Sequence, residues 1–177
     1  MPLSIGILSG PFNPPHKGHI HISEVARRKL RLDQIWWVVS KQNPLEKKEY
    51  IFDYDKRISK CRDITANCKN IKISRAEKNL FPYDSKVYTY KLLKRLWQMY
   101  PKTKFYFIIG SDNLENFHKW QNSDEIFNIA ELIVISRSGH KYKALSSKTA
   151  RKFRDKIHFI HAKHVNISST EIRNDGK

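Results

Sequence analysis

Cysteine is scarce in this chain of 177 residues, which holds only Cys61 and Cys68. The two lie seven positions apart in a segment predicted to be one helix, so they are about 10 Å apart along its axis. A disulfide needs Cα atoms within about 7 Å of each other. The sequence therefore predicts two small, reduced core residues and excludes a disulfide-based scaffold.

Long apolar stretches are missing as well. No run approaches the roughly 18 apolar residues that a membrane-spanning helix needs. The first residues show no basic region followed by a long apolar segment, so we expect no signal peptide. We therefore expect a cytoplasmic protein without a membrane partner.

Glycine and proline are few, at six and seven residues. Collagen-like and low-complexity architectures are excluded by this composition. Hydrophobic residues make up 40% and charged residues 29% of the chain, as in a globular protein. The length predicts a single domain over residues 1–177.

Negative charge is in short supply, because 17 acidic residues face 34 lysines and arginines, for a net charge of +17. Such an excess favours polyanions: a nucleotide triphosphate, a nucleic acid or an anionic membrane surface. The basic residues are spread over several segments, chiefly 27–31, 91–95 and 141–156, and form no single stripe. Charge therefore indicates a class of partner and nothing finer.

Apolar runs alternate with helical patterns along the whole chain. Residues 4–9 and 35–39 read as strands, and residues 18–32 between them carry apolar side chains at helical spacing. Strands that are apolar on both faces are typical of a parallel sheet covered by helices. The alternation continues to residues 157–160, and predicts an α/β, doubly wound, Rossmann-like parallel sheet of five or six strands flanked by helices.

Three polar clusters follow predicted strands, at residues 10–19, 110–112 and 168–173. In an open α/β sheet, ligands bind in the crevice outside the carboxyl ends of the strands. The predicted fold therefore brings these three clusters together into one site.

The first cluster contains His16 and His19, three positions apart after two prolines. If a helix begins near His16, both rings point the same way from its positive end, and they add two N–H donors to the backbone amides of an anion site. A proline-rich connector with surface histidines is the alternative. Zinc binding through these residues and His21 is disfavoured, because His21 points elsewhere and no cysteine or carboxylate lies nearby, so we expect no metal site built by the protein.

The last cluster begins with Ser168 and Glu171, which have the spacing of a helix capping box. That interpretation leaves Ser169, Thr170 and Arg173 without a role. Placed at the positive end of a helix, these two hydroxyls and the guanidinium form a cradle for a polyphosphate.

Neither standard phosphate loop occurs: G-x-G-x-x-G does not follow the first strand, and G-x-x-x-x-G-K-[ST] is absent. The loop present instead resembles the G-x-F-x-P-x-H-x-G-H motif of the nucleotidyltransferase superfamily, through Gly10, Phe12, Pro14, His16, Gly18 and His19. Residues 167–173 are similar to the second motif of that superfamily, I-S-S-T-x-I-R. The two motifs stand in the expected order, at the first and last predicted strands.

Further segments resemble the bacterial nicotinate-nucleotide adenylyltransferases. Residues 107–120 are similar to their F-I-I-G-x-D-x-L…F…W pattern, and residues 88–89 to the start of their Y-T-x-x-T-L segment. Asn43 begins a segment similar to N-P-L-K in which Lys47 comes one place late, and Arg137 lies near their arginine after the fifth strand.

This resemblance implies transfer of AMP from ATP to nicotinic acid mononucleotide, which gives deamido-NAD and pyrophosphate, with Mg²⁺ carried by ATP. It assigns catalysis to His16, His19 and Arg173. It assigns ATP binding to Gly10, Phe12, Gly18, Gly110, Asp112, Ser168, Ser169, Thr170 and Arg173, and mononucleotide binding to Asn43, Lys47, Thr89, Trp120 and Arg137.

Alternatives remain at the level of function and of single residues. Related transferases act on nicotinamide mononucleotide, phosphopantetheine or a phospho-alcohol, and the same fold can serve as a basic nucleic-acid-binding module, although no nucleic-acid partner is expected. Assembly into a homo-oligomer is left open. Asp112 has the alternative of a simple turn, Trp120 that of a core anchor, and Thr89 that of an ordinary helix residue.

Overall fold

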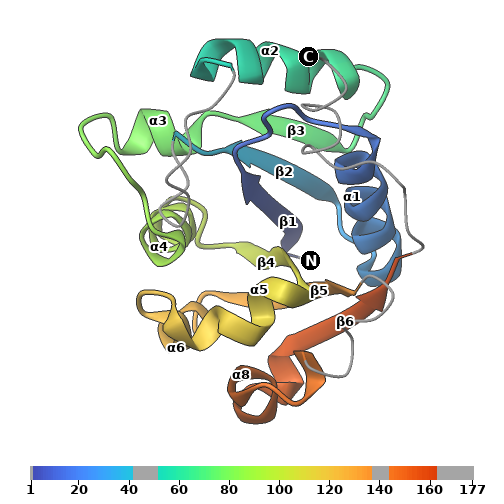
Figure 1. Ribbon diagram of the computed structural model, residues 1–177, viewed down its shortest axis with the longest axis vertical. Coiled ribbons are helices and arrows are strands. Elements are labelled where there is room, and N and C mark those ends of the chain that lie inside the picture. Colours follow the sequence, from blue (N-terminus) through green and yellow to red (C-terminus); the bar gives the residue numbers. More distant parts are fainter. Residues whose placement is uncertain (1, 42–51, 137–143, 163–177) are drawn as a thin grey trace.

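A parallel sheet forms the centre of the protein. The computed structural model describes residues 2–41, 52–136 and 144–162. Within these ranges six strands pair side by side in the order β3-β2-β1-β4-β5-β6, and each pair is parallel. The strands are β1 (Leu3–Gly10), β2 (Gln34–Val39), β3 (Ile71–Ser74), β4 (Thr103–Gly110), β5 (Ala130–Ser136) and β6 (Ile157–His161). The predicted doubly wound, Rossmann-like sheet is confirmed (Figure 1).

Helices cover both faces of this sheet (Figure 1). Ala26 of one helix and Ile58 of another share a buried cluster with Leu8 of the central strand, on one face. Leu93 of a third helix packs in the cluster on the other face. The helices with described bounds are α1 (Lys17–Leu30), α2 (Tyr54–Ile64), α3 (Ala76–Leu80), α4 (Thr89–Met99), α5 (Ser111–Asn116), α6 (Ser123–Ile126) and α8 (Lys148–Lys152), with 3-10 turns η1 (Phe117–Lys119) and η2 (Arg154–Lys156).

Helix bounds follow from caps and from the strands that come next. α2 begins where the Asp53 carboxylate accepts the Lys56 N–H at 2.8 Å, and it ends where the Thr65 hydroxyl donates to the Cys61 carbonyl at 2.7 Å. α6 is short, because the chain enters β5 at Ala130. None of the helices described is long and apolar enough to cross a membrane.

Both thiols are free, as predicted, but the expected single helix holding both is wrong, because α2 ends at Ile64 and Cys68 lies beyond a turn. Cys61 is fully buried among the side chains beneath α1 and α2, whereas Cys68 is only half-buried at the margin of that cluster.

The strand order changes direction between β1 and β4. The chain runs outward from β1 through β2 to β3, then returns to the other side of β1 and continues through β4 to β6. Connections therefore leave the carboxyl ends of β1 and β4 toward opposite sides, and a crevice opens between them. The segments after these two strands are the first two predicted polar clusters.

Candidate active site

A cavity of about 560 Å³ lies at this change of direction. Gly10 and Pro11 line it at the end of β1, and Gly110 and Asp112 line it at the junction of β4 and α5. A further wall comes from the start of α4 and from the turn after η1, through Val87, Tyr88, Thr89, Lys119, Trp120 and Gln121. Segments more than 100 positions apart in the sequence thus share one cavity.

His16 and His19 form a reciprocal cap at the start of α1. The Gly18 N–H donates to His16 Nδ1 at 3.1 Å, and the His16 N–H donates to His19 Nδ1 at 3.2 Å. These are the two bonds of a capping box, made here by imidazoles in place of a hydroxyl and a carboxylate. The ring centroids are 3.8 Å apart. The predicted helix start and the predicted proximity of the two rings are both observed.

The cap fixes which ring nitrogens carry protons. A nitrogen that accepts a backbone N–H cannot itself be protonated, so each neutral ring holds its proton on Nε2. Each Nε2–H is then a donor whose direction is set by the backbone of α1. The same geometry uses the Gly18 amide internally, so that amide is not one of the phosphate donors expected at this helix end.

The two rings stand beside the cavity and not in its wall, which reaches Gly10 and Pro11 of the preceding loop. His16 is nearly buried, at 8% exposure. The Phe12 ring packs against both His19 and Trp37. Its centroid is 4.9 Å from that of His19, and it stacks on Trp37 with the ring centroids 4.8 Å apart. Phe12 is 1% exposed and has a φ of 47°, so its ring packs the loop against the core and leaves only its backbone on the outer side.

Gly110 and Asp112 are brought together at the junction of β4 and α5. Gly110 is the N-cap residue of α5, and Asp112 lies in the first turn. A Cβ at position 110 would collide with Asp112 Oδ1. The Asp112 carboxylate can therefore lie against residue 110 only because that residue is a glycine. Asp112 is exposed and lines the cavity, and its role toward a nucleotide stays a prediction.

Thr89 and Trp120 both line the cavity. Thr89 is the first residue of α4, and the positive end of that helix borders the cavity. The cap residue Tyr88 supplies no side-chain hydrogen bond to the first backbone N–H groups of α4. Trp120 packs against Phe117 at 4.9 Å between centroids and also lines the cavity. The core contact is therefore observed, and the role of Trp120 toward a ligand stays a prediction.

A buried arginine that sequence reasoning did not single out holds two sides of the cavity together. Arg57 of α2 is 1% exposed. Its Nη1 donates to the carbonyls of Pro11 at 2.7 Å and Ser40 at 2.8 Å, and its Nη2 donates to the carbonyl of Lys41 at 3.2 Å. One guanidinium thus fixes the exits of both β1 and β2. In the sequence it was one basic residue among many, and no local pattern marks it.

Lys41 and Glu77 continue this network. The Lys41 N–H donates to Glu77 Oε1 at 2.7 Å, and its ammonium donates to the carbonyls of Phe81, Pro82 and Asp84. Glu77 is 2% exposed and lines the cavity, and burial raises its pKa to about 7. Neither residue was predicted, because their partners are backbone atoms far away in the sequence.

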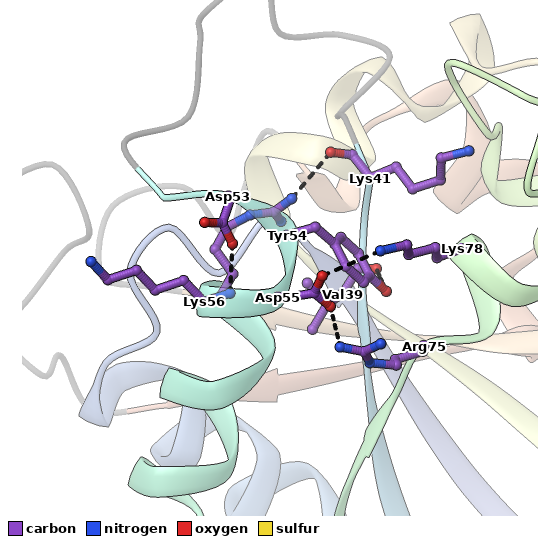
Figure 2. A network of polar contacts seen from close by, with 9 residues as sticks. Val39, Lys41, Asp53, Tyr54, Asp55, Lys56, Arg75 and Lys78 are labelled. Atoms are coloured by element: carbon purple, nitrogen blue, oxygen red, sulfur yellow. Dashed lines mark hydrogen bonds and ion pairs between the residues drawn. The ribbon is translucent and has the colours of Figure 1, made fainter.

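Polar contacts also join the start of α2 to Arg75 and Lys78, as Figure 2 shows. Tyr54 donates its hydroxyl to the Val39 carbonyl at 3.3 Å, and burial raises its pKa to about 12. Arg75 and Lys78 pair with Asp55 and lie over the Tyr54 ring. These contacts dock the start of α2 against β2 and α3.

Seven predicted site residues lie outside the described ranges: Asn43, Lys47, Arg137, Ser168, Ser169, Thr170 and Arg173. Their positions in the site stay predictions. β6, which precedes the last cluster in the chain, ends at His161 on the same edge of the sheet as β1 and β4.

Comparison with known proteins adds independent findings. A family model described as cytidylyltransferase-like matches residues 7–175. A protein named probable nicotinate-nucleotide adenylyltransferase from Rhizobium johnstonii is 35% identical, over 96% of this chain and 92% of its own length. A protein of the same name from Pelagibacter ubique is 38% identical, over 96% and 91% of the two chains.

Solved structures share the fold. The nicotinic acid mononucleotide adenylyltransferase of Plasmodium falciparum complexed with NaAD matches with a TM-score of 0.76 at 20% identity, covering 97% of this chain and 83% of the other. A putative nicotinate-nucleotide adenylyltransferase from Vibrio parahaemolyticus matches with a TM-score of 0.65 at 24% identity, over 99% and 89% of the two chains. At these identities the likeness concerns the fold alone.

Proposed function

The chain belongs to the cytidylyltransferase-like family, and from this premise we propose that it is a nicotinate-nucleotide adenylyltransferase, which transfers AMP from ATP to nicotinic acid mononucleotide and releases pyrophosphate. The observation that carries the proposal is the cavity where the strand order changes direction. It joins the exits of β1 and β4, suited to a nucleotide, to a wall formed by Thr89 and Trp120, suited to a pyridine ring and its carboxylate. Relatives of that name, 34–38% identical over most of the chain, support it.

The chemistry needs no protein nucleophile. The 5′-phosphate of the acceptor is already an anion, and its oxygen attacks the α-phosphorus of ATP while the bond to the pyrophosphate oxygen breaks. The protein then has to align the two phosphates and to stabilise charge that develops on the α-phosphate and on the leaving pyrophosphate. In this proposal the Nε2–H groups of His16 and His19 serve the transferred phosphate, and Arg173, Ser169 and Thr170 hold the leaving one.

Magnesium belongs to the nucleotide in this proposal. Mg²⁺ prefers oxygen ligands and keeps several waters, so a triphosphate supplies most of what it needs. In the described ranges no group of three or more histidine, cysteine or acidic side chains gathers that could hold a metal ion. Asp112 is the carboxylate that borders the cavity at the nucleotide side, and it would reach the ion or a ribose hydroxyl.

The acceptor lies on the other side. The positive end of α4 and the Thr89 hydroxyl would receive the nicotinate carboxylate, and Trp120 would stack on the ring. Asn43, Lys47 and Arg137 are proposed to bind the acceptor phosphate. We take residues 1–177 as one nucleotidyltransferase domain that acts in the cytoplasm.

Pyrophosphate release measured with ATP, Mg²⁺ and a panel of acceptors tests the proposal. Nicotinic acid mononucleotide should give the highest kcat/KM, ahead of nicotinamide mononucleotide and phosphopantetheine. Release that is highest with another acceptor would replace the substrate but keep the reaction type. A protein that releases no pyrophosphate with any acceptor, yet binds DNA with a steep dependence on salt, would be the basic nucleic-acid-binding module.

A further inference from the structure

Two buried polar side chains border the cavity without belonging to any recognised motif. Ser40 directly follows β2, and Glu77 lies in the short helix α3. They are 5% and 2% exposed, and both line the cavity. Buried polar groups that face a binding cavity are candidates for contact with the ligand.

The Ser40 hydroxyl has no hydrogen-bond partner among the residues that the structure describes, although its oxygen is buried. Its backbone is fully used: the N–H donates to the Gly10 carbonyl at 2.9 Å, and the carbonyl accepts from Arg57. Ser40 is thus fixed beside the exit of β1, where the phosphates are expected. A buried hydroxyl without a partner costs stability, and a ligand that supplies one recovers that cost.

Glu77 is held next to Ser40. Its Oε1 accepts the N–H of Lys41, the residue that follows Ser40. The cations nearby are committed to backbone carbonyls, Lys41 to those of residues 81, 82 and 84 and Arg57 to those of residues 11, 40 and 41. Among the described residues no ion pair involves Glu77, so its carboxyl is available to a ligand that donates hydrogen bonds.

The chemistry of this pair selects one part of the substrate. A phosphate or a carboxylate has no proton to donate and would be repelled by Glu77 in its charged form, whereas a ribose hydroxyl both donates and accepts. Ser40 is bonded to Gly10, on the phosphate side, and α3, which carries Glu77, packs against α4, at whose start Thr89 forms the proposed nicotinate side. In a mononucleotide the ribose is the group between phosphate and base.

We propose that the Ser40 hydroxyl and the Glu77 carboxyl bind the ribose hydroxyls of the acceptor mononucleotide. This rests on the proposed function, and it names the two side chains that recognise the ribose of the acceptor. Glu77 accepts from one hydroxyl, and Ser40 exchanges a hydrogen bond with the same or the neighbouring hydroxyl.

A cycle of protein and substrate changes tests the assignment. Glu77→Gln keeps an oxygen for the Lys41 N–H, and Ser40→Ala removes only the unpartnered hydroxyl. Each would be assayed with nicotinic acid mononucleotide and with its 2′-deoxy and 3′-deoxy forms. Loss of one hydrogen bond from a ribose hydroxyl to the Glu77 carboxyl predicts a KM for the normal acceptor raised about five- to tenfold in Glu77→Gln, with the KM for ATP unchanged. Glu131→Gln, at the amino end of β5 and away from the cavity, is the control: Glu131 pairs with Lys104 and His158, and this change should leave the KM for the acceptor at its wild-type value.

At least one deoxy acceptor should remove the difference, so that wild type and Glu77→Gln use it equally well. Ser40→Ala should raise the acceptor KM while its thermal midpoint stays at or above that of the wild type. Equal losses on normal and deoxy acceptors, or a lower midpoint with unchanged KM, would overturn the ribose assignment alone. A wild-type protein that transfers AMP to no nicotinate mononucleotide would overturn the proposed function, and the ribose assignment with it.

Discussion

Two imidazole rings at the start of α1 occupy the positions that a serine and a glutamate take in the usual capping box. The arrangement ties two properties together, because the Nδ1 atoms cap the helix and the Nε2 atoms carry the donors. The sequence predicted that both rings share a helix start. It did not predict that they cap it, since imidazoles are uncommon in that role.

Asparagine at position 19 separates the two properties. Its Oδ1 can still accept the His16 N–H, but nothing replaces the Nε2 donor. We expect His19→Asn to keep its thermal midpoint and to lose about 10²- to 10³-fold in turnover, as for removal of one donor to developing charge. His118→Asn, at an exposed position, is the control. Near-normal turnover in a folded His19→Asn protein would remove this residue from the site.

The pKa of Glu77, which burial raises from 4.5 to about 7, makes stability depend on pH. Between these values the folded protein holds a proton that the unfolded chain has lost, so this contribution is complete below pH 4.5 and disappears as pH rises through 7. Over the whole titration, the contribution of Glu77 to the free energy of unfolding changes by about 3 kcal/mol. Denaturant titrations from pH 4.5 to 8 should show a fall in unfolding free energy for the wild type that Glu77→Gln reduces. If the unfolding free energies of the two proteins changed with pH in parallel, Glu77 would not be the source of the pH dependence.

At the scale of elements, α2 is connected to the site through one side chain. Arg57 supplies donors to three carbonyls at the exits of β1 and β2. We expect Arg57→Met to destabilise the protein by about 3 kcal/mol, because buried carbonyls are left without donors. Arg57→Lys should recover only part of this, since an ammonium lacks the planar fork. Urea denaturation should give a free energy of unfolding that falls from the wild type to Arg57→Lys and again to Arg57→Met. Arg62→Met, at an exposed position, is the control. A lysine variant as stable as wild type would show that charge alone suffices.

The start of α4 sets the choice of acceptor in this account. Nicotinate carries a negative charge that nicotinamide lacks, so the positive helix end and the Thr89 hydroxyl favour it. We expect nicotinic acid mononucleotide to be used at least about tenfold better than the amide form, a difference of about 1.4 kcal/mol. Thr89→Val should narrow the gap and Trp120→Ala should weaken both acceptors. Equal kcat/KM values for the two acceptors in the wild type would refute this assignment.

Most elements could be predicted from apolar spacing, but their ends could not. The buried run of β5 and the stripe formed by Leu92, Leu93 and Leu96 on α4 are local patterns that can be read from the sequence alone. α3 and α5 were not predicted, because five or six residues give too little periodicity to read.

At the scale of the whole molecule, the parallel sheet and the convergence of the first two polar clusters followed from the order of strands. Gly10, Thr89, Gly110, Asp112 and Trp120 line one cavity, although 110 positions separate the first from the last. Ser40, Arg57 and Glu77 could not be found in that way. Their partners are backbone carbonyls and amides of distant loops, which leave no pattern in the sequence.

The fate of the α-phosphate of ATP tests the central claim most directly. The protein would be incubated with Mg²⁺, nicotinic acid mononucleotide and ATP labelled at its α-phosphorus, and the products separated. Attack on the α-phosphorus predicts that the label enters the dinucleotide deamido-NAD, in step with unlabelled pyrophosphate. Label that stays in ADP, or in ATP with no dinucleotide formed, would contradict adenylyl transfer to this acceptor.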